Sequence, residues 1–192
     1  MATPARRTWS SRQTELLDDL EALFLASGFR HLTIGEMASR VRCSRRTLYT
    51  IAGSKEELVI LVIERFYNRL GREARRRAAE VSDPVEKIGA YMSAPVDRYR
   101  DVSPELNSDM LGYTPTRHVV DRHKELAMQA LHVIIKDGTA SGAIRFAEPM
   151  LLAEILDAAF QRIRDPEVLA MTGMGRSDAL RAFIDLLARG LR

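Results

Sequence analysis

Two arginines, a threonine and a tyrosine stand close together in the first third of this sequence, as Arg45, Arg46, Thr47 and Tyr49. Guanidinium groups form paired hydrogen bonds with phosphates and with guanine edges, and hydroxyl groups hydrogen-bond to phosphate oxygens. Lysine is rare in the chain, so arginine supplies most of its positive charge. These residue types indicate noncovalent binding of a polyanion.

The positive charge of the chain is concentrated near its N-terminus. Residues 1–55 contain nine Lys and Arg residues and five Asp and Glu residues, whereas residues 56–192 contain 20 basic and 21 acidic residues. A small basic head on a nearly neutral body favours nucleic acid as the partner of the head. The alternative is that a difference of a few charges between the two parts of the chain has no functional meaning.

Motifs for catalysis or metal binding are missing from the sequence. Gly173 and Gly175 lack the residues that complete a phosphate-binding loop, and neither an HExxH nor a GxSxG motif occurs. His118 and His123, with Asp121 between them, do not share one helical face, which favours a solvated helix over a metal site. The sequence therefore predicts no enzyme, no cofactor and no metal.

The composition is that of an ordinary globular protein, with 46% hydrophobic and 29% charged residues. Its one cysteine, Cys43, excludes an intrachain disulfide. The longest aliphatic run, residues 58–63, is too short to cross a bilayer, and no apolar segment follows the N-terminal arginines. We expect a cytoplasmic protein that does not bind a membrane.

Helix signals run along the chain, and no strand-like alternation interrupts them convincingly. Ser10-x-x-Gln13, Thr33-x-x-Glu36 and Ser54-x-x-Glu57 are capping boxes, and Ser44 is a good N-cap. We expect helices over about 12–26, 33–41, 44–52, 55–81, from 84 onward, over 117–136 and twice in the last 45 residues. Pro95, Pro104 and Pro115 are expected to interrupt the middle region, and Asp137-Gly138 and Ser141-Gly142 are expected to close the helix at 117–136. The predicted fold class is all-α, with about nine helices.

The two short helices near 33–41 and 44–52 are joined by a tight turn and follow a longer helix. This arrangement predicts a helix-turn-helix, whose second helix lies in the DNA major groove and presents its N-terminal residues to the bases. Here those residues are Arg45, Arg46 and Thr47.

Two matched apolar stripes occupy the last 45 residues, with the same spacing of 0, 3, 4, 7, 8 and 11. The first stripe is Leu152, Ile155, Leu156, Ala159, Phe160 and Ile163, and the second is Leu180, Phe183, Ile184, Leu187, Ala188 and Leu191. Two such helices form half of a four-helix bundle that a second copy of the chain completes. The stripes predict a homodimer, with burial inside one chain as the alternative.

The segment from Thr33 to Tyr49, followed by Gly53-Ser-Lys-Glu-Glu-Leu58, resembles the DNA-binding signature of TetR-family (tetracycline-repressor-like) transcription regulators. The motif resemblance covers residues 12–66, and the helical layout extends it. It implies a homodimer that binds double-stranded palindromic operator DNA, usually as a repressor, and releases it when a small-molecule effector binds in the C-terminal domain. It also implies a DNA-binding domain over 1–55 and a ligand-binding and dimerisation domain over 56–192.

The resemblance assigns DNA contacts to particular residues. Thr33, Tyr49 and Lys55 match positions that contact phosphates, while Ser44, Arg45, Arg46 and Thr47 meet bases and backbone. Arg6 and Arg7, two further basic residues of the head, complete the predicted set.

The effector pocket is predicted from composition in the stretch where the family binds its ligands. Aromatic and methionine side chains suit a mostly apolar ligand, and ordinary core packing is the alternative. The predicted lining is Phe66, Tyr67, Tyr91, Met92, Tyr99, Met110, Tyr113 and Met128.

The sequence departs from the family pattern at four positions. Arg42 replaces a turn glycine, which predicts either a left-handed conformation at Arg42 or a reshaped turn. Ile51 and Ala52 replace an aromatic pair, which predicts looser docking of the second short helix. Cys43 fills a small apolar slot, which favours a packed thiol, with redox sensing as the alternative. An alternative function is therefore a dimeric helical interaction protein whose degenerate head does not bind DNA. The intact run from Arg45 to Tyr49 argues against it.

Overall fold

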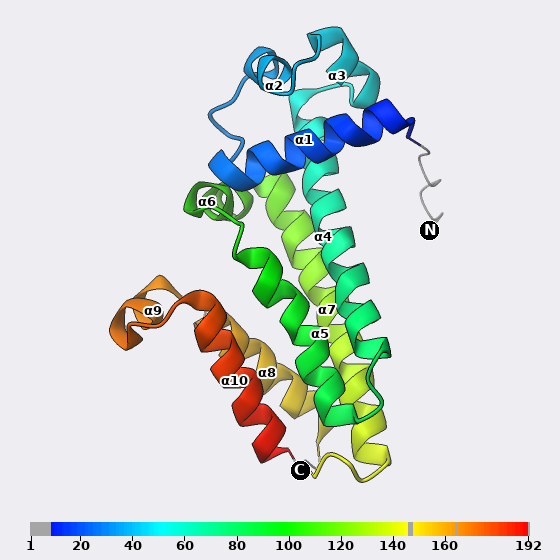
Figure 1. The fold of residues 1–192 in the computed structure, drawn as a ribbon, viewed down its shortest axis with the longest axis vertical. Helices are drawn as coiled ribbons and strands as arrows, with labels where there is room; N and C mark the ends of the chain where they lie inside the picture. The colour runs from blue at the N-terminus through cyan, green and yellow to red at the C-terminus, as the bar shows by residue number, and fades with distance from the viewer. Residues whose placement is uncertain (1–8, 146–147, 164, 192) are drawn as a thin grey trace. The chain divides into compact units, whose positions relative to one another are not determined.

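The computed structural model describes residues 9–145, 148–163 and 165–191, and every regular element in these ranges is an α-helix (Figure 1). The helices are α1 Ser11–Ser27, α2 Ile34–Arg40, α3 Arg45–Ile51, α4 Lys55–Ala79, α5 Pro84–Tyr99, α6 Pro104–Gly112, α7 Thr114–Ala140, α8 Pro149–Ile163, α9 Pro166–Thr172 and α10 Arg176–Gly190. The all-α prediction is confirmed, with ten described helices where about nine were expected.

Helices α6 and α9 are not among the helices predicted from the sequence, although both have a helix-start signal. Ser103 and Asp165 are N-caps, and each is followed by a proline in the first turn, where the missing N–H costs no helical hydrogen bond. Short helices bounded by such caps are hard to separate from loops, because they contain too few turns to show an apolar period.

The predicted capping boxes at Ser10 and Thr33 are both formed. At the start of α4 the box is incomplete. The Ser54 hydroxyl accepts the N–H of Glu57 at 3.0 Å, but the Glu57 carboxylate accepts the N–H of Gly53 at 2.8 Å, where a capping box would use that of Ser54.

The prediction that prolines interrupt the middle region is wrong at Pro95 and Pro115. Helix α5 continues through Pro95 to Tyr99, because buried side chains on both sides of the proline hold it in place. Pro115 lies in the first turn of α7, where a proline is tolerated.

Helix α7 continues through Gly138 and ends at Ala140, directly before the second predicted stop at Ser141-Gly142, where Gly142 has a φ of 77°. A Cβ on this glycine would lie 2.5 Å from Cδ1 of Ile144 and 2.8 Å from Cβ of Pro84. Gly138 therefore permits a close approach between chain segments. A glycine with this role looks the same in the sequence as a glycine that ends a helix.

The chain divides into two compact units. The first contains the described residues up to Phe66 together with Val102–Val119, and the second contains Tyr67–Asp101 and the described residues from Val120 onward. The division at residue 55 into DNA-binding and ligand-binding domains is a functional one and stays a prediction.

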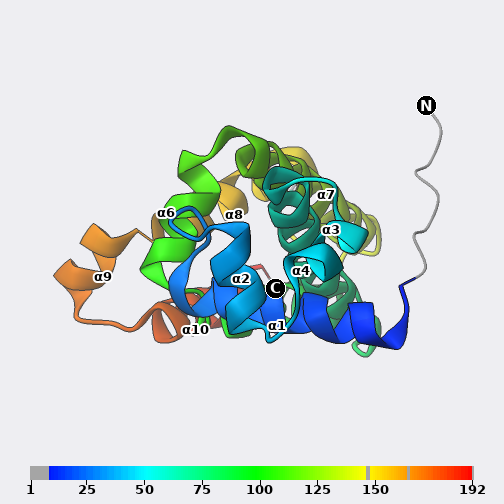
Figure 2. The same cartoon turned by 90° about the horizontal axis from the view of Figure 1, so that it is seen from above.

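In the first unit, α1, α2, α3 and the start of α4 enclose an apolar core. Its members include Leu16, Leu20, Phe24, Met37, Leu48, Leu58 and Val62, all of which are buried. In the view from above, α2 and α3 face the reader (Figure 2). Helix α6 packs against α1, and the backbone N–H of Ser103 donates to the carbonyl of Leu25 at 2.9 Å.

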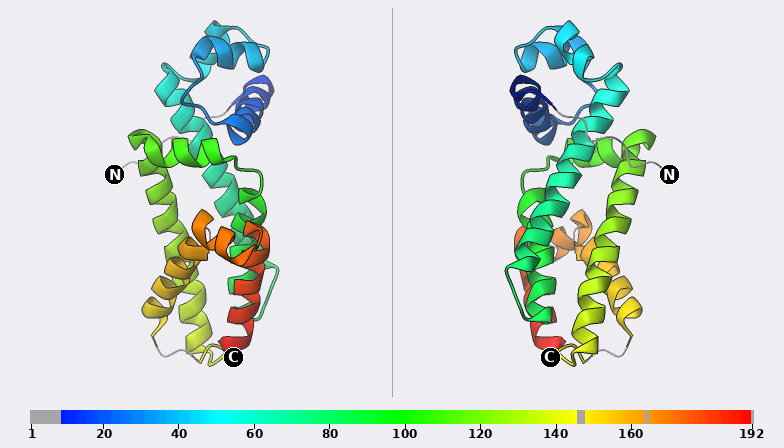
Figure 3. Two further views of the ribbon diagram at one scale, coloured as in Figure 1. Left: turned by 90° about the vertical axis from the view of Figure 1, so that its left-hand side faces the viewer. Right: turned by 90° about the vertical axis from the view of Figure 1, so that its right-hand side faces the viewer.

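In the second unit, α10 packs against α5 and α8 (Figure 3). The shared core contains Val85 and Ile88 of α5, Leu131 and Ile135 of α7, and Leu152 and Leu156 of α8. Arg77 of α4 also connects to α5, because its Nη1 donates to Asp97 at 2.7 Å and to Ser93 at 3.0 Å.

Candidate nucleic-acid interface

The N-terminal end of α3 presents polar side chains at the surface of the first unit. The Ser44 hydroxyl accepts the N–H of Thr47 at 3.0 Å, and the two hydroxyl oxygens are 2.8 Å apart. This cap fixes the start of α3, so that Arg45 and Arg46 occupy its first turn and are exposed. The Tyr49 side chain is 52% exposed. The first turn of a recognition helix is the part that reaches base edges.

The opposite side of α3 packs into the core of the first unit. Leu48, Ile51 and Ala52 are all buried. Ile51 and Ala52 stand where the family has an aromatic pair. Both are buried, so this side of α3 is not exposed to solvent.

The turn between α2 and α3 contains a left-handed residue, one of the two outcomes predicted from the sequence. Arg42 has a φ of 52°, and the N–H of the next residue, Cys43, donates to the carbonyl of Ala38 at 2.9 Å. Cys43 is half-buried, and burial raises the pKa of its thiol. A thiol that stays protonated favours the packing interpretation over redox chemistry.

Two of the predicted phosphate contacts already have partners within the protein. The Thr33 hydroxyl donates to the Glu36 carboxylate at 2.8 Å, and hydrogen bonds from the Thr33 backbone and hydroxyl lower the pKa of Glu36. The Lys55 ammonium donates to the carbonyl of Arg30 at 3.0 Å. An ammonium has three N–H donors, so this bond is compatible with a phosphate contact. Arg6 and Arg7, also predicted to contact DNA, lie outside the described residues.

The residues predicted to line an effector pocket fall into both compact units. Phe66, Met110 and Tyr113 belong to the first unit, and Tyr67, Tyr91, Met92, Tyr99 and Met128 to the second. Tyr113 packs edge-on against Phe29, with ring centroids 6.1 Å apart. Its pKa is raised by burial and then by its hydrogen bond with Glu56.

Within the second unit the predicted pocket residues have two kinds of surroundings. Tyr91 and Met92 lie in the hydrophobic core and Met128 packs against it. Burial raises the pKa of the Tyr91 phenol. Tyr67 and Tyr99 are buried with their hydroxyl oxygens 3.0 Å apart, and the Tyr67 ring stacks on His123 with centroids 5.3 Å apart.

The two predicted C-terminal stripes are only partly at the surface. Leu152, Leu156, Leu180 and Leu191 are buried, and Phe160, Phe183, Ile184 and Leu187 pack against the core of the second unit. Ile155 is exposed, while Ala159 and Ile163 are half-buried. Burial within one chain, the alternative left open by the sequence, therefore accounts for much of both stripes.

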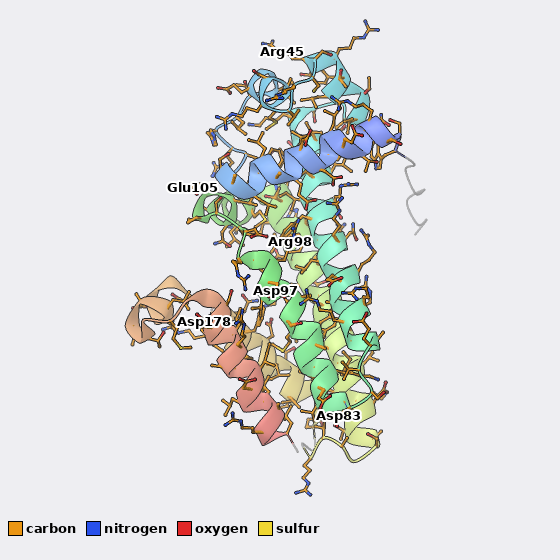
Figure 4. The ribbon with its side chains drawn as sticks, in the orientation of Figure 1. Arg45, Asp83, Asp97, Arg98, Glu105 and Asp178 are labelled. Atoms are coloured by element: carbon orange, nitrogen blue, oxygen red, sulfur yellow. The ribbon has the colours of Figure 1, made fainter. Side chains whose placement is uncertain are left out.

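The first unit also has an open hollow of about 670 Å³, lined by Arg30, His31, Pro104, Glu105, Ser108 and Asp109. Figure 4 labels Glu105, one of the lining residues, on α6. It also labels Arg45, which lies at the end of the first unit that contains α2 and α3. The hollow contains none of the predicted effector residues.

In the described part of the chain, no group of three or more His, Cys, Asp or Glu side chains could hold a metal ion. Among the same residues, no helix combines the length and apolar character needed to cross a membrane.

Comparison with known sequences gives a partial match. No family model matches the chain. Two curated proteins from Mycobacterium tuberculosis strains CDC 1551 and H37Rv, each named an uncharacterized HTH-type transcriptional regulator, are 34% identical to it over 97 residues. The match covers 48% of this chain and 48% of each relative, so it spans about half the length of these relatives.

Solved structures match nearly the whole chain. A TetR transcription regulator from Haloarcula marismortui has a TM-score of 0.77 at 14% identity, covering 95% of this chain and 99% of that one. The chain has the TetR-family fold.

Two further structures with this fold contain ligands. The regulator FadR of Bacillus subtilis, in complex with stearoyl-CoA, has a TM-score of 0.71 at 13% identity and covers 93% of this chain and 99% of its own. A putative transcriptional regulator of Saccharomonospora viridis, in complex with choline, has a TM-score of 0.76 at 16% identity, with 95% and 97% covered. All of these proteins are named as regulators, and none as an enzyme.

Several residues with structural roles in this TetR-family fold were not singled out from the sequence. Asp109 of α6 accepts hydrogen bonds from the backbone N–H groups of Phe29 and Arg30. Leu151 of α8 and Leu186 of α10 are exposed beside the predicted stripes. None of these gives a local signal, because each role depends on which helices meet.

Proposed function

We propose that this chain is a DNA-binding transcriptional regulator whose α3 enters the major groove. The observation that carries the proposal is the exposed first turn of α3, where Ser44, Arg45, Arg46 and Thr47 follow a capped turn, with Tyr49 one turn further on. The names of the relatives and the TetR-family fold support it. Thr33, Lys55, Arg6 and Arg7 belong to the same proposed DNA contacts.

The proposed regulator acts as a homodimer. A palindromic operator presents two half-sites about 34 Å apart, which one two-fold dimer contacts with its two copies of α3. Helices α8 and α10 pack against each other, and each has exposed apolar side chains: Leu151 and Ile155 on α8, and Leu186 on α10. Ile155 belongs to the predicted set, together with Ala159, Ile163 and Phe183, and Leu151 and Leu186 extend it.

A small-molecule effector is proposed to bind in the second unit and to release the DNA, which would make the protein a repressor. The support from this chain is the buried cluster of Tyr67, Tyr99 and His123, which combines aromatic rings with hydroxyl groups. Stearoyl-CoA and choline, bound by two proteins of the same fold, differ greatly in size and charge. The fold therefore does not specify the chemical class of the effector, and a ligand screen is needed to identify it.

The alternative is a dimeric helical interaction protein whose head does not bind DNA. This alternative arose because Arg42 replaces a turn glycine and Ile51 and Ala52 replace an aromatic pair. Arg42 does adopt the left-handed conformation that the turn requires, and Ile51 and Ala52 are buried. Both observations support a formed head.

The test is to select bound fragments from the genome of the source organism with the purified protein, and then to measure affinity by fluorescence anisotropy. Arg46→Ala should lose about 1–3 kcal/mol of discrimination between the selected site and random DNA. The control is Arg72→Ala, an exposed arginine of α4 in the second unit, which should bind as the wild type does. Recovery of no enriched sequence would favour the interaction protein.

Effectors are tested on the same DNA complex. Stearoyl-CoA, choline and related compounds are screened for a rise in Tm, and each stabilising compound is then tested for release of the operator. Tyr67→Phe, which removes the hydroxyl that lies 3.0 Å from that of Tyr99, should weaken the response and leave ligand-free DNA affinity unchanged. Saturating binding without any change in operator affinity would contradict induction.

A further inference from the structure

Gly35, in the first turn of α2, lies directly beneath the guanidinium group of Arg45. A Cβ on this glycine would be 2.8 Å from Nη2 of Arg45 and 3.0 Å from both Nε and Cζ. The shortest of these distances is one that real Cβ atoms essentially never show, and the other two are tighter than most real contacts. The guanidinium group therefore occupies the space that a side chain at position 35 would fill.

The backbone does not explain a glycine at this position. Gly35 lies in a regular helix and is not one of the described glycines with positive φ, which are Gly28, Gly142 and Gly173. Glycine is less favourable in a helix than alanine, because it loses more backbone freedom on folding. The absence of a side chain at position 35 leaves the space in which the Arg45 guanidinium group lies.

In a helix-turn-helix the first helix crosses the DNA backbone, while the second lies in the groove. A guanidinium group that lies over α2 is therefore on the side of the phosphates. Arg46 follows Arg45 in α3, and successive residues of a helix point about 100° apart. Arg46 is exposed, and none of its atoms is among the nearest neighbours of a Cβ on Gly35.

We propose that Gly35 is a positioning residue for DNA recognition, because the room above it holds Arg45 against α2. Arg45 then contacts the DNA backbone, and Arg46 is the arginine of this pair that reads base edges. The inference rests on the proposed DNA binding and refines it, since the sequence alone assigned both arginines to the bases. Holding the guanidinium group in advance also lowers the entropy lost when the contact forms.

Gly35→Ala separates this role from folding. The atoms that the new Cβ would meet are at the far end of a flexible side chain, so Arg45 can move aside while α2 stays intact. Alanine also favours the helix. The matched control is Gly71→Ala in α4, where the new Cβ would have its nearest neighbour at 3.4 Å, an ordinary contact.

The experiment measures anisotropy on operator and on random DNA of equal length, over a range of salt concentrations. Arg45→Ala should weaken binding to both DNAs by the same factor, roughly tenfold or more, and lower the salt slope by about 2 per dimer. Gly35→Ala should weaken both DNAs equally and by no more than Arg45→Ala does. The double variant should bind as Arg45→Ala alone, because the glycine acts through the arginine. Gly71→Ala should bind as the wild type does.

Three results would overturn the inference: wild-type affinity in Gly35→Ala, effects that multiply in the double variant, or a loss of operator discrimination in Arg45→Ala. If Gly35→Ala fails to fold, as judged by circular dichroism, Arg45→Ala still decides between backbone and base contact. A wild-type protein that binds no DNA is a distinct outcome, since it contradicts the proposed function itself.

Discussion

Arg42 holds a backbone conformation that few side chains adopt, with a φ of 52° in the turn between α2 and α3. Its side chain is exposed, so the conformation is imposed by the turn and not by packing of the side chain. The left-handed region costs a residue with a Cβ roughly 1–2 kcal/mol. The turn keeps its shape because α2 and α3 are each fixed by buried residues, Met37 and Leu48 among them.

Arg42→Gly should therefore stabilise the protein by about 1 kcal/mol, since glycine adopts this φ without strain but has more freedom in the unfolded chain. The measurement is the free energy of unfolding in urea. Arg42→Ala is the control for loss of the charged side chain, and it should show no such gain. Equal stability of the glycine and alanine variants would contradict the strain argument.

Glu73 of α4 is a second residue whose properties depend on its immediate neighbours. Arg76 donates to both of its carboxylate oxygens, at 2.8 and 2.7 Å, and Arg77 donates to one of them at 2.8 Å. Hydrogen bonds from Arg76 and then Arg77 lower the pKa of Glu73 from its ordinary 4.5 to about 2.

Because this pKa is lower in the folded state, the interaction stabilises the fold above about pH 4.5 and is lost as the pH falls toward 2. The chemical shift of the Glu73 carboxyl carbon, followed by NMR against pH, should have its midpoint near 2. Arg76→Gln should move the midpoint back toward 4.5. A wild-type midpoint at the ordinary value would mean that the arginines do not hold the carboxylate in solution.

At the scale of elements, α6 is joined to the turn between α1 and α2 by one carboxylate. Asp109 Oδ2 accepts the N–H of Phe29 at 2.7 Å and that of Arg30 at 2.9 Å. The same oxygen would lie 2.5 Å from a Cβ on Gly28, whose φ is 71°. The turn thus combines a left-handed glycine with an acceptor supplied by a helix about 80 residues away in the sequence.

Asp109→Ala should lower the free energy of unfolding by about 1–3 kcal/mol, because it leaves two backbone donors, one of them on the buried Phe29, without their acceptor. Asp109→Asn retains one carbonyl oxygen and should lose less. Urea unfolding measures both variants. If the alanine variant were as stable as the wild type, water would be replacing the carboxylate at no cost.

At the scale of the whole molecule, the proposed dimer depends on the apolar surface that α8 and α10 leave exposed. Phe183 is a poor site for testing it, because its side chain packs against the core of its own chain. Leu186 is 67% exposed and Ile155 is 47% exposed, so each can be changed with less effect on folding.

Leu186→Glu and Ile155→Glu should each weaken dimerisation roughly a hundredfold or more, because a carboxylate at the interface loses water without gaining a partner. Sedimentation should change from about twice 21.6 kDa toward the mass of one chain. Leu111→Glu, on α6 in the first unit and 46% exposed, is the matched control and should remain dimeric. A wild-type protein that sediments as a monomer would exclude this interface.

The sequence by itself determined the features that depend on neighbouring residues. Capping boxes at Ser10 and Thr33 and the N-cap at Ser44 are set within a few positions of the chain, and the structure has all three. Apolar periodicity likewise identified the long helices, since a repeat of 3.6 residues is visible in any helix of several turns. The helix-turn-helix and its exposed arginines followed from these local signals.

Only the tertiary structure decided how separate segments meet. Helix α5 passes through Pro95, Gly138 lets α7 approach Ile144 and Pro84, and Asp109 binds the turn after α1. It also divided the C-terminal stripes into buried and exposed residues and placed Arg45 over Gly35. The physical reason is that burial and contact depend on distant segments competing for the same space, and residues next to each other in sequence do not record which distant segment will be their neighbour.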